Sequence, residues 1–360
     1  MIFPGDPAPL FSVRSNVNPL FSFDTTAGRN LVLTFVTPLA GDRGYLQKLA
    51  SSPFFDDDFA ALFIVSQGCE DDQPGRLPLR IPGVRAFFDN GHIAALYGIE
   101  RFKGRPVSFV ISPRLQVIGL VASPEEQHAE HVLEVLQKIP HAAHCSAMLA
   151  HPPILIIPHV FEPGLCKALI QGYGTHGGED SGFMRDVGGK TVEVRDKSHK
   201  VRRDWNISPE NKDLIGVLQN RFKRRVIPEI KKAYQFEVTR MERYLVACYS
   251  AEDNGHFRAH RDNTTKGTAH RRFAVSVNLN AEDYDGGDLR FPEFGRKTYR
   301  PPTGGCCVFS CSLLHEAAPV TKGTRYVFLP FLYDEDARKI REENFKYVAS
   351  HAPHILETTS

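Results

Sequence analysis

Several features are scarce in this sequence of 360 residues, and each absence narrows what the chain can be. Apolar runs are short, and none reaches the roughly 18 residues of a membrane-spanning helix. The chain starts with MIFPGDPAPLFSV, which lacks the basic and apolar segments of a secretory signal. We therefore expect a cytoplasmic protein without a membrane partner.

Cysteine is also scarce, and its number is odd. The doubled C-x-x-C pattern of a zinc ribbon is missing, and most cysteines lie within apolar stretches. We expect reduced thiols, most of them buried in strands, rather than a disulfide framework. The seven cysteines are Cys69, Cys145, Cys166, Cys248, Cys306, Cys307 and Cys311.

Neither sign of charge prevails, because 44 Lys and Arg stand against 42 Asp and Glu, for a formal charge of +2. No field of the whole protein would draw it to nucleic acid, and we expect no nucleic-acid partner. A basic stretch from Lys190 to Lys232 could form a groove for nucleic acid or an acidic substrate. Its interspersed acidic residues and few aromatics favour a solvated helix face instead.

Length and periodicity predict two domains. Residues 1–138 alternate strand-like and helix-like runs, which indicates an α/β layer fold, and 124–138 has the pattern of a capped helix. Residues 139–153 lack periodicity and are interpreted as a linker. Residues 154–340 become mainly strand-like after an initial helical part, which indicates an antiparallel sandwich or barrel. Residues 341–360 are interpreted as a C-terminal tail.

Two histidines and an aspartate in the strand-rich half have the composition of a metal site. His260 and Asp262 are two residues apart, so on a strand both side chains point to one face. His315 follows the apolar stretch GCCVFSCSLL and would come from another strand. Two imidazoles and one carboxylate form the facial triad that binds non-haem Fe(II) and leaves coordination positions open. The alternative is a surface pair of His260 and Asp262, with His315 at a strand end.

Arg325 lies inside the apolar stretch TRYVFLPFLY, which indicates burial. A guanidinium in such a strand requires an anionic partner, because the desolvation of an unpaired charge is costly. A bound carboxylate in bidentate geometry would be a suitable partner. An Asp or Glu side chain of the protein would serve as well, so both interpretations stay open.

The stretch from Tyr244 to Asp334 contains four motifs whose order is informative. They are VACYS (246–250), His260-x-Asp262-Asn263, EDYDGGDL (282–289) and HEAAPVTKGTRYVF (315–328). With these motifs the chain resembles the 2-oxoglutarate/Fe(II)-dependent dioxygenase superfamily, and within it the prolyl-4-hydroxylase-like branch that includes the PKHD-type hydroxylases. The similarity begins earlier, with HVFEPGLCKALI at 159–170.

The resemblance implies a fold and a set of binding residues. The C-terminal domain would be a double-stranded β-helix, or jelly roll, with supporting helices. Arg325 would pair with the distal carboxylate of the cosubstrate 2-oxoglutarate, and Tyr249 lies where relatives often place a tyrosine that contacts it. Some relatives have a cosubstrate-binding tyrosine at the position of Asn278, so that contact would be altered here. The implied Fe(II) ligands are His260, Asp262 and His315.

The implied activity is a dioxygenase reaction. 2-Oxoglutarate and O2 would be consumed, succinate and CO2 released, and a prolyl-like residue or another peptidyl or small-molecule substrate hydroxylated. Ascorbate is a candidate reductant. The iron carries out the oxygen chemistry in this family, so no catalytic residue beyond the metal ligands is expected.

The N-terminal half has motifs of its own, which begin with GDPAPLFSV and RNLVLTFVTP. By these and later segments, residues 5–121 resemble a peroxiredoxin or thioredoxin-like domain. The family's peroxidatic cysteine would follow the Thr-Pro, but residues 37–42 read TPLAGD. Cys69 lies beside acidic residues, which disfavour a thiolate. We expect a degenerate redoxin used for packing, homodimerisation or substrate presentation.

Two other functions stay open from the sequence. A thiol peroxidase carried by residues 1–138 would consume peroxide even without iron. A non-catalytic, metal-free scaffold or sensor would retain its function without the three candidate iron ligands.

Overall fold

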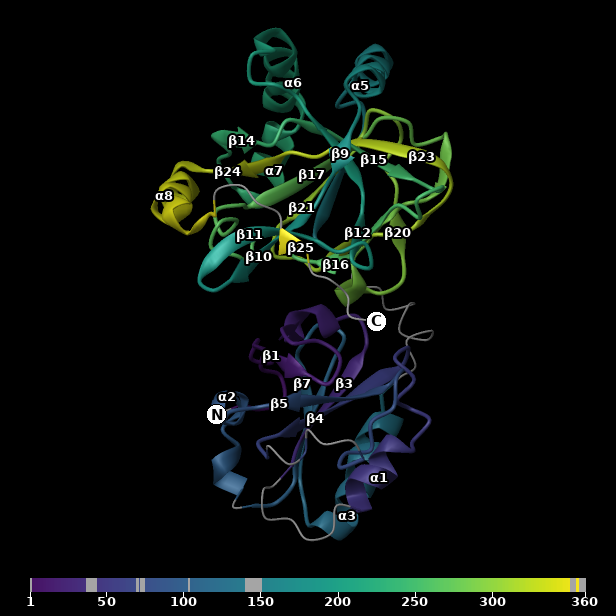
Figure 1. Cartoon of the computed structure of the whole chain (residues 1–360), viewed down its shortest axis with the longest axis vertical. Helices are drawn as coiled ribbons and strands as arrows, with labels where there is room; N and C mark the ends of the chain where they lie inside the picture. Colours follow the sequence, from purple (N-terminus) through teal and green to yellow (C-terminus); the bar gives the residue numbers. More distant parts are fainter. Residues whose placement is uncertain are drawn as a thin grey trace. The chain divides into compact units, whose positions relative to one another are not determined.

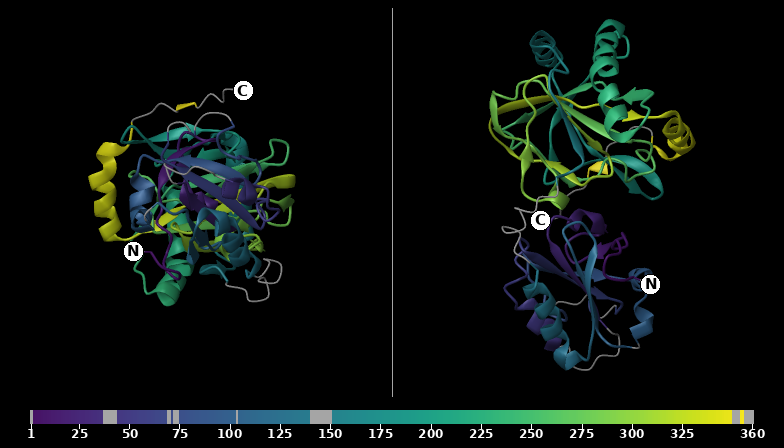
Figure 2. Two further views of the ribbon diagram at one scale, coloured as in Figure 1. Left: turned by 90° about the horizontal axis from the view of Figure 1, so that it is seen from below. Right: turned by 180° about the vertical axis from the view of Figure 1, so that it is seen from behind.

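The computed structural model describes residues 2–36, 44–68, 71, 75–102, 104–139, 151–349 and 354–355 (Figure 1, Figure 2). The chain forms two compact units, Met1–His151 with Pro292–Arg296 and Pro152–Phe291 with Lys297–Ser360. Most of the predicted linker 139–153 lies outside the described residues, so its boundaries stay a prediction. No helix within the described ranges is long and apolar enough to cross a membrane.

A mixed sheet of seven strands forms the N-terminal unit, in the order β2-β1-β5-β4-β3-β6-β7. The neighbours β3, β4 and β5 are parallel, and the other pairs are antiparallel. Every residue of β3 and β4 is buried, as expected for parallel strands covered on both faces. The strands are β1 (Ser12–Ser15), β2 (Phe21–Ser22), β3 (Asn30–Phe35), β4 (Ala60–Ser66), β5 (Val84–Phe88), β6 (Val107–Ile111) and β7 (Val117–Ala122).

Helices pack on this sheet and confirm the predicted α/β character. α3 (Glu125–Gln137) corresponds to the helix expected over 124–138 and buries Ala129, Val132 and Leu136 in the core. The predicted side-chain cap is wrong, because α3 has no cap hydrogen bond and Ser123 contacts His128 instead. The remaining helical segments are α1 (Gly44–Ala50), α2 (His92–Tyr97), η1 (Phe23–Thr26) and η3 (Ile99–Phe102).

Buried polar side chains cross the core of this unit. Thr34 Oγ1 of β3 lies 2.8 Å from Ser108 Oγ of β6, which in turn lies 2.8 Å from His128 Nε2 of α3. Ser123 Oγ lies 3.2 Å from His128 Nδ1. Burial lowers the pKa of His128 to about 4, and the neighbouring His131 contributes to this shift. His128 is therefore neutral at physiological pH, with a hydroxyl partner for each ring nitrogen.

Acid should destabilise the N-terminal unit through His128. The unfolded state takes up a proton near the ordinary histidine pKa of about 6.5, whereas the folded state resists it down to about 4. Between these values the free energy of unfolding should fall by about 1.4 kcal/mol for each unit of pH lowered. Scanning calorimetry of the full chain across this range measures the effect.

Two variants separate His128 from other titrating groups. His128→Gln should remove most of the pH dependence, while His131→Gln on the same helix should preserve most of it, because burial is the larger cause of the shift. Trp205 is the chain's one tryptophan and lies in the C-terminal unit, so its fluorescence follows the other unit. An N-terminal transition whose pH dependence survives His128→Gln would refute this role.

Two large antiparallel sheets and a three-stranded one form the C-terminal unit, as the strand pattern of 154–340 predicts. The main path of the ten-stranded sheet runs β14-β24-β17-β23-β15-β13-β9. In addition, β18 pairs with β23, β21 pairs with β17, and β8 pairs with β21. The five-stranded sheet runs β12-β16-β22-β19-β20. The remaining sheet, β10-β11-β25, contains a hairpin closed by Gly188 and Gly189, both with positive φ.

The strand bounds follow from short extended runs between turns. They are β8 (Ile154–Ile157), β9 (Glu179–Asp180), β10 (Phe183–Val187), β11 (Lys190–Arg195), β12 (Lys200–Val201), β13 (Arg203–Asn206), β14 (Arg240–Glu242), β15 (Leu245–Ser250), β16 (His256–His260), β17 (Phe273–Asn278), β18 (Tyr284–Gly286), β19 (Leu289–Arg290), β20 (Thr298–Tyr299), β21 (Cys306–Ser310), β22 (His315–Ala317), β23 (Val320–Phe328), β24 (Phe331–Tyr333) and β25 (His354–Ile355).

Strand alternation gives the ten-stranded sheet a helix-covered face and an interior face. Val246 of β15 packs with α5 (Pro163–His176), α6 (Lys212–Arg225) and α7 (Ile227–Tyr234) in the main core. Its neighbours Leu245, Ala247 and Tyr249 point the other way and pack against residues of β16 and β22 in the five-stranded sheet. The interior face therefore lies between the two large sheets. The last helical segments are α8 (Glu335–Asn344), η4 (Pro292–Phe294) and η5 (Phe345–Tyr347).

Two further expectations can be compared with this unit. All five of its cysteines but Cys248 are buried, as predicted. The prediction that most are buried in strands is wrong for this unit, because Cys166 lies on a helix and Cys311 in a turn. Cys69 and Cys145 lie outside the described residues. Within the basic stretch, Arg221 and Arg225 of α6 pair with Glu162, as expected of an exposed helix face. Lys200 and Arg202 differ, because both are buried.

Candidate metal centre

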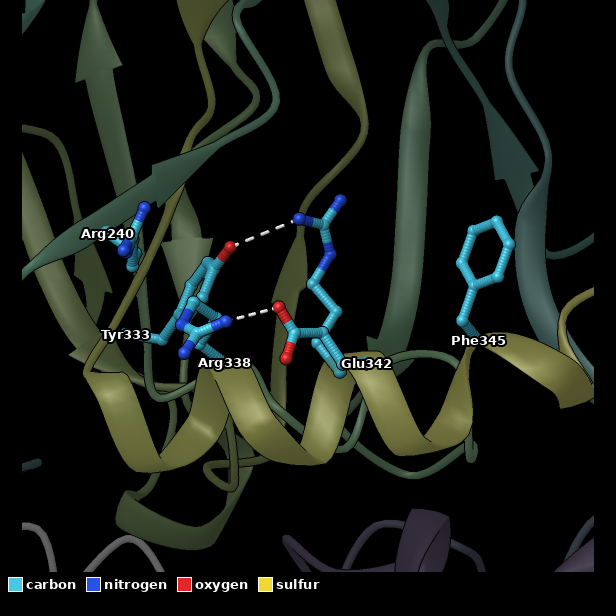
Figure 3. Close-up of a pocket in the computed structure, with 6 residues that line it drawn as sticks. Arg240, Tyr333, Arg338, Glu342 and Phe345 are labelled. Atoms are coloured by element: carbon cyan, nitrogen blue, oxygen red, sulfur yellow. Dashed lines mark hydrogen bonds and ion pairs between the residues drawn. The ribbon is translucent and has the colours of Figure 1, made fainter.

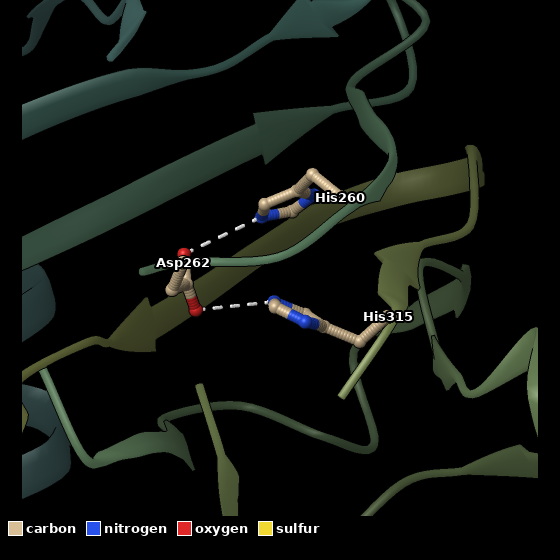
Figure 4. Close-up of side chains that lie close together, drawn as sticks. All are labelled: His260, Asp262 and His315. Carbon is tan, nitrogen blue, oxygen red and sulfur yellow. Dashed lines mark ion pairs between the residues drawn. The ribbon is translucent and has the colours of Figure 1, made fainter. Parts of the chain in front are cut away.

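The pairing of β16 with β22 brings the predicted triad together (Figure 4). His260 ends β16, and its direct partner across the strands is His315, the first residue of β22. Asp262 lies just beyond the end of β16, where its backbone N–H donates to the carbonyl of Cys311. His315 thus begins a new strand rather than ending the apolar β21, because a turn at 311–314 separates the two.

The three side chains present their ligand atoms to one another. Asp262 Oδ1 lies 3.6 Å from His260 Nε2, and Oδ2 lies 3.3 Å from His315 Nε2. One ligand atom from each residue falls within 4.8 Å of the others. Within the described residues, this is the group of His, Cys, Asp and Glu side chains arranged to hold a metal ion.

Backbone contacts orient both imidazoles for coordination. His260 Nδ1 donates to the carbonyl of Arg258 at 2.7 Å, and His315 Nδ1 donates to that of Leu313 at 3.0 Å. A carbonyl accepts only, so the proton resides on Nδ1 and the lone pair of Nε2 faces Asp262. Metal-binding histidines usually donate their other ring N–H in this way.

Electrostatics keep the ligands in the protonation states that coordination requires. Burial lowers the pKa of His260 to about 4, and the nearby His315 adds to the shift. Burial alone would raise the pKa of Asp262, but His315 and His260 outweigh it and hold the pKa well below 3.8. A neutral imidazole and an ionised carboxylate next to each other fit a divalent cation.

Arg325 and Tyr249 face each other on the interior face. They are direct partners between β23 and β15, with the Arg325 guanidinium 5.2 Å from the Tyr249 ring centroid. Arg325 is only 2% exposed, and its Nη2 donates to Ser276 Oγ at 3.1 Å. No carboxylate among the described residues pairs with it, and its Nε has no hydrogen-bond partner there. This finding favours the bound-carboxylate interpretation of Arg325 over a protein Asp or Glu.

The EDYDGGDL motif adds Tyr284 to this group, which sequence reasoning did not single out. The Tyr284 hydroxyl is buried without a hydrogen-bond partner in the described part of the chain. Burial raises the pKa of Tyr284, and the adjacent Arg325 partly offsets the rise. Gly287, at φ +68°, makes the approach possible, because a Cβ there would lie 2.9 Å from Val320 and 3.2 Å from Arg325. The position of Tyr284 within the EDYDGGDL motif was the sequence signal that could have identified it.

Asn278 lies near this group but is engaged elsewhere. It is 2% exposed, and its Nδ2 donates to the carbonyl of Pro301 at 2.7 Å. Ser276 shares its face of β17 and makes the contact with Arg325 instead. The sequence places both residues on one face, but does not show which one reaches the guanidinium. A cosubstrate contact of Asn278 therefore stays a prediction.

A separate surface pocket of about 560 Å³ lies beside α8 (Figure 3). Its cations are engaged in ion pairs: Arg240 with Glu335, Arg338 with Glu335 and Glu342, and Arg341 with Glu242. The pocket contains none of the triad residues, so it does not account for the metal chemistry. Its lining residues are Arg240, Tyr333, Arg338, Arg341, Glu342 and Phe345.

Sequence comparisons agree with the geometry of this centre. Residues 244–333 match the 2OG-Fe(II) oxygenase superfamily. A PKHD-type hydroxylase of a Synechococcus strain is 31% identical over 88 residues, which cover 23% of this chain and 38% of that protein. A PKHD-type hydroxylase of Pseudomonas fluorescens is 37% identical over 90 residues, which cover 23% and 39%. Residues 244–333 are thus the part of the chain that is similar to the 2OG-Fe(II) oxygenase superfamily.

The extent of these similarities is limited. The chain spans less than half the length of the curated relatives it matches. Among solved structures, it is similar to a prolyl hydroxylase from Trichoplax adhaerens, in complex with a hypoxia inducible factor oxygen degradation domain peptide fragment. The identity is 18% and the TM-score 0.43, with 57% of this chain and 96% of that chain covered.

Removal of the carboxylate should abolish metal binding. Asp262→Ala should weaken the affinity for Mn(II), used in place of Fe(II), by more than about 100-fold, since losing a partner that only orients a ligand already costs 10- to 100-fold. Titration calorimetry measures this, with circular dichroism to verify folding. Asp253→Ala, at an exposed position in the turn before β16, should bind Mn(II) like the wild type. Equal affinity in both variants would disprove the site.

Proposed function

We propose that the chain is an Fe(II)- and 2-oxoglutarate-dependent dioxygenase that hydroxylates its substrate and releases succinate and CO2. The observation that carries this proposal is the presence of two features on the two large sheets that pack against each other. One is the open His-Asp-His triad, and the other is the buried Arg325, which has no carboxylate partner among the described residues. The donor set fits Fe(II), since two imidazoles and a carboxylate leave coordination positions free.

Each residue has a separate task in this proposal. His260, Asp262 and His315 hold Fe(II), which supplies the oxygen chemistry when it is bound together with 2-oxoglutarate. Arg325 binds the distal carboxylate of 2-oxoglutarate, which satisfies its free Nε. The Tyr284 hydroxyl donates to the same carboxylate. Tyr249, which is the partner of Arg325 across the strands β15 and β23, covers this carboxylate.

Aromatic rings around the two histidines exclude water from the centre. Phe257 stacks on His260 with ring centroids 3.5 Å apart, and Phe309 lies 4.5 Å from His315. Phe291 contacts both Phe309 and His315. Exclusion of water strengthens electrostatic interactions within the site and protects reactive species from side reactions.

Arg325→Gln should impair cosubstrate binding selectively. A hydrogen bond to a charged group contributes about 1.5 to 3 kcal/mol, so the 2-oxoglutarate concentration for half-maximal turnover should rise at least about tenfold. Mn(II) affinity should stay unchanged. Lys322→Gln, at an exposed position on the same strand, is the matched control. An unaltered cosubstrate requirement in Arg325→Gln would show that another residue holds the carboxylate.

Succinate formation tests the proposed function itself. Purified protein with Fe(II) and 2-oxoglutarate under air should produce succinate, with a higher yield when ascorbate is added as reductant. His315→Ala should produce none, because the triad is incomplete. Succinate from both proteins, or none from wild-type protein that binds Fe(II) and 2-oxoglutarate, would overturn the proposal. Peroxide consumption that survives iron removal would favour the thiol peroxidase alternative.

The substrate and the N-terminal unit belong to the same proposal. We infer a peptidyl or small-molecule substrate with a prolyl-like group, which the similarity to PKHD-type hydroxylases supports. The thioredoxin-like character of the N-terminal unit rests on the motifs of 5–121 together with the mixed sheet that they form. Both the TPLAGD segment and Cys69 lie outside the described residues. A degenerate redoxin that contributes to a homodimer stays a prediction.

A further inference from the structure

Three cationic side chains converge on one buried carboxylate in the C-terminal unit. Arg202 Nη2 lies 2.6 Å from Asp204 Oδ2, and Arg243 Nη2 lies 3.5 Å from the same oxygen. Lys200 Nζ donates to Ser181 Oγ at 2.8 Å, and this hydroxyl donates to Asp204 Oδ2 at 2.6 Å. Lys200, Arg202, Asp204 and Arg243 are named the basic cluster below.

The basic cluster has an excess of buried positive charge. Lys200, Arg202 and Asp204 are each at least nine-tenths buried. Burial lowers the pKa of Lys200 well below its usual range, and the nearby Arg202 adds to this shift, which Asp204 only partly offsets. Glu242, another buried carboxylate, is already engaged by His270, Arg271 and Arg341. Arg202 and Arg243 therefore share the single carboxylate of Asp204, and a second anion would complete the pairing of the buried charges.

Two atoms of the cluster have no hydrogen-bond partner in the described part of the chain. They are Arg202 Nε, which needs an acceptor, and Asp204 Oδ1, which accepts from a donor. Buried polar atoms are nearly always hydrogen-bonded. A ligand with a carboxylate oxygen next to an amide N–H would satisfy both atoms at once. Acidic peptides and N-acylated amino acids have this combination.

The basic cluster adjoins the residues of the proposed reaction. Arg202 Nη1 lies 3.4 Å from the Tyr249 hydroxyl, on the ring that Arg325 also contacts. Lys200 Nζ lies 4.8 Å from the ring of Phe257, and Phe257 stacks on His260. The Arg243 side chain is 34% exposed, so the cluster reaches solvent there. The cluster is therefore accessible to solvent at Arg243 and lies next to side chains that contact His260 and Arg325.

We propose that the basic cluster binds a carboxylate of the substrate, so that the chain acts on an acidic peptide segment or an N-acylated amino acid. This inference rests on the proposed function and narrows its substrate class. The cosubstrate does not neutralise the cluster, because the dianion of 2-oxoglutarate and Asp262 already balance Fe(II) and Arg325. A substrate carboxylate supplies the missing negative charge, and its neighbouring N–H donates to Asp204.

Ligand NMR tests this subsite without knowledge of the substrate. The protein is loaded with Mn(II) and saturating 2-oxoglutarate, which blocks Arg325 and prevents turnover. N-acetylglycine offers a terminal carboxylate, N-acetyl-aspartic acid α-amide a side-chain carboxylate, and N-acetylglycinamide is the neutral counterpart. Mn(II) should broaden the acetyl resonance of at least one acid and leave the amide sharp. The acid that responds identifies the source of the carboxylate.

Arg203, which is the neighbour of Arg202 and the first residue of β13, provides the matched control. Arg202→Gln should weaken binding of the acid at least tenfold, and so should Arg243→Gln, which is less buried and serves if the first variant fails to fold. Arg203→Gln should bind like the wild type, because Arg203 points to the opposite face and is 57% exposed. Equal broadening by acid and amide, or equal affinities in all three variants, would overturn the proposal.

Failure of the proposed function would be distinguishable from failure of this inference. If Mn(II) and 2-oxoglutarate do not bind, the dioxygenase proposal fails. Saturation transfer from metal-free Arg325→Gln protein to the same three probes then still decides the subsite, since the competing carboxylate site is removed. If this variant prefers the acids, and the preference disappears when Arg202→Gln is added, the subsite is supported. If the variant shows no preference for the acids, the subsite is refuted.

Discussion

The register between β16 and β22 is the constraint on which the metal centre depends. His260 and His315 are direct partners across these strands, with ring centroids 4.3 Å apart. A slip of one residue in either strand would turn one imidazole to the other face of the sheet. Phe257 of β16 pairs with Ala317 of β22 in one buried cluster, and Phe309 of β21 packs on His315, so such a slip would be costly. Hydrophobic packing therefore holds the two imidazoles in place, although the burial of polar side chains is itself unfavourable.

Strand pairing and alternation also orient the side chains on the interior face of the ten-stranded sheet. Alternation on β15 directs Val246 into the helix-covered core, while Tyr249 points toward the five-stranded sheet. Arg325 is paired with Tyr249, so its charge is also directed inward rather than to solvent. The apolar core below α5, α6 and α7 provides the free energy that offsets the burial of these charges. The main apolar core and the proposed ligand site thus lie on opposite faces of the same strands.

The sequence was sufficient for the parts whose chemistry is local. The spacing of His260 and Asp262 indicated a pair that the structure brings next to His315, and the apolar setting of Arg325 indicated its burial. The turn before His315 and the contact of Ser276 with Arg325 could not be predicted, because both depend on pairing between distant strands. The charge pattern along the chain also led to a wrong prediction, because it indicated that Lys200 and Arg202 are exposed. The predicted helix face is found only from Lys212 onward, in α6 and α7, whereas the earlier part of the stretch forms the strands β11, β12 and β13. Only the tertiary structure shows that the side chains of Lys200 and Arg202 are buried.

The N-terminal unit shows the same division. Buried parallel strands and the helix α3 follow from periodicity, because continuous apolar runs and helical spacing are local signals. The bond from Ser108 to His128 joins residues of a strand and a helix that no periodicity connects. Ser123 illustrates the difficulty, since a residue typical of a helix cap turns inward to the histidine instead.

A crystal structure of the chain grown with Mn(II) and 2-oxoglutarate would test the central claim most directly. The account predicts anomalous scattering from a metal in contact with His260, Asp262 and His315. It also predicts the distal carboxylate of 2-oxoglutarate at the Arg325 guanidinium. A metal bound elsewhere, or an Arg325 that pairs with a protein carboxylate while 2-oxoglutarate lies at another place, would contradict it.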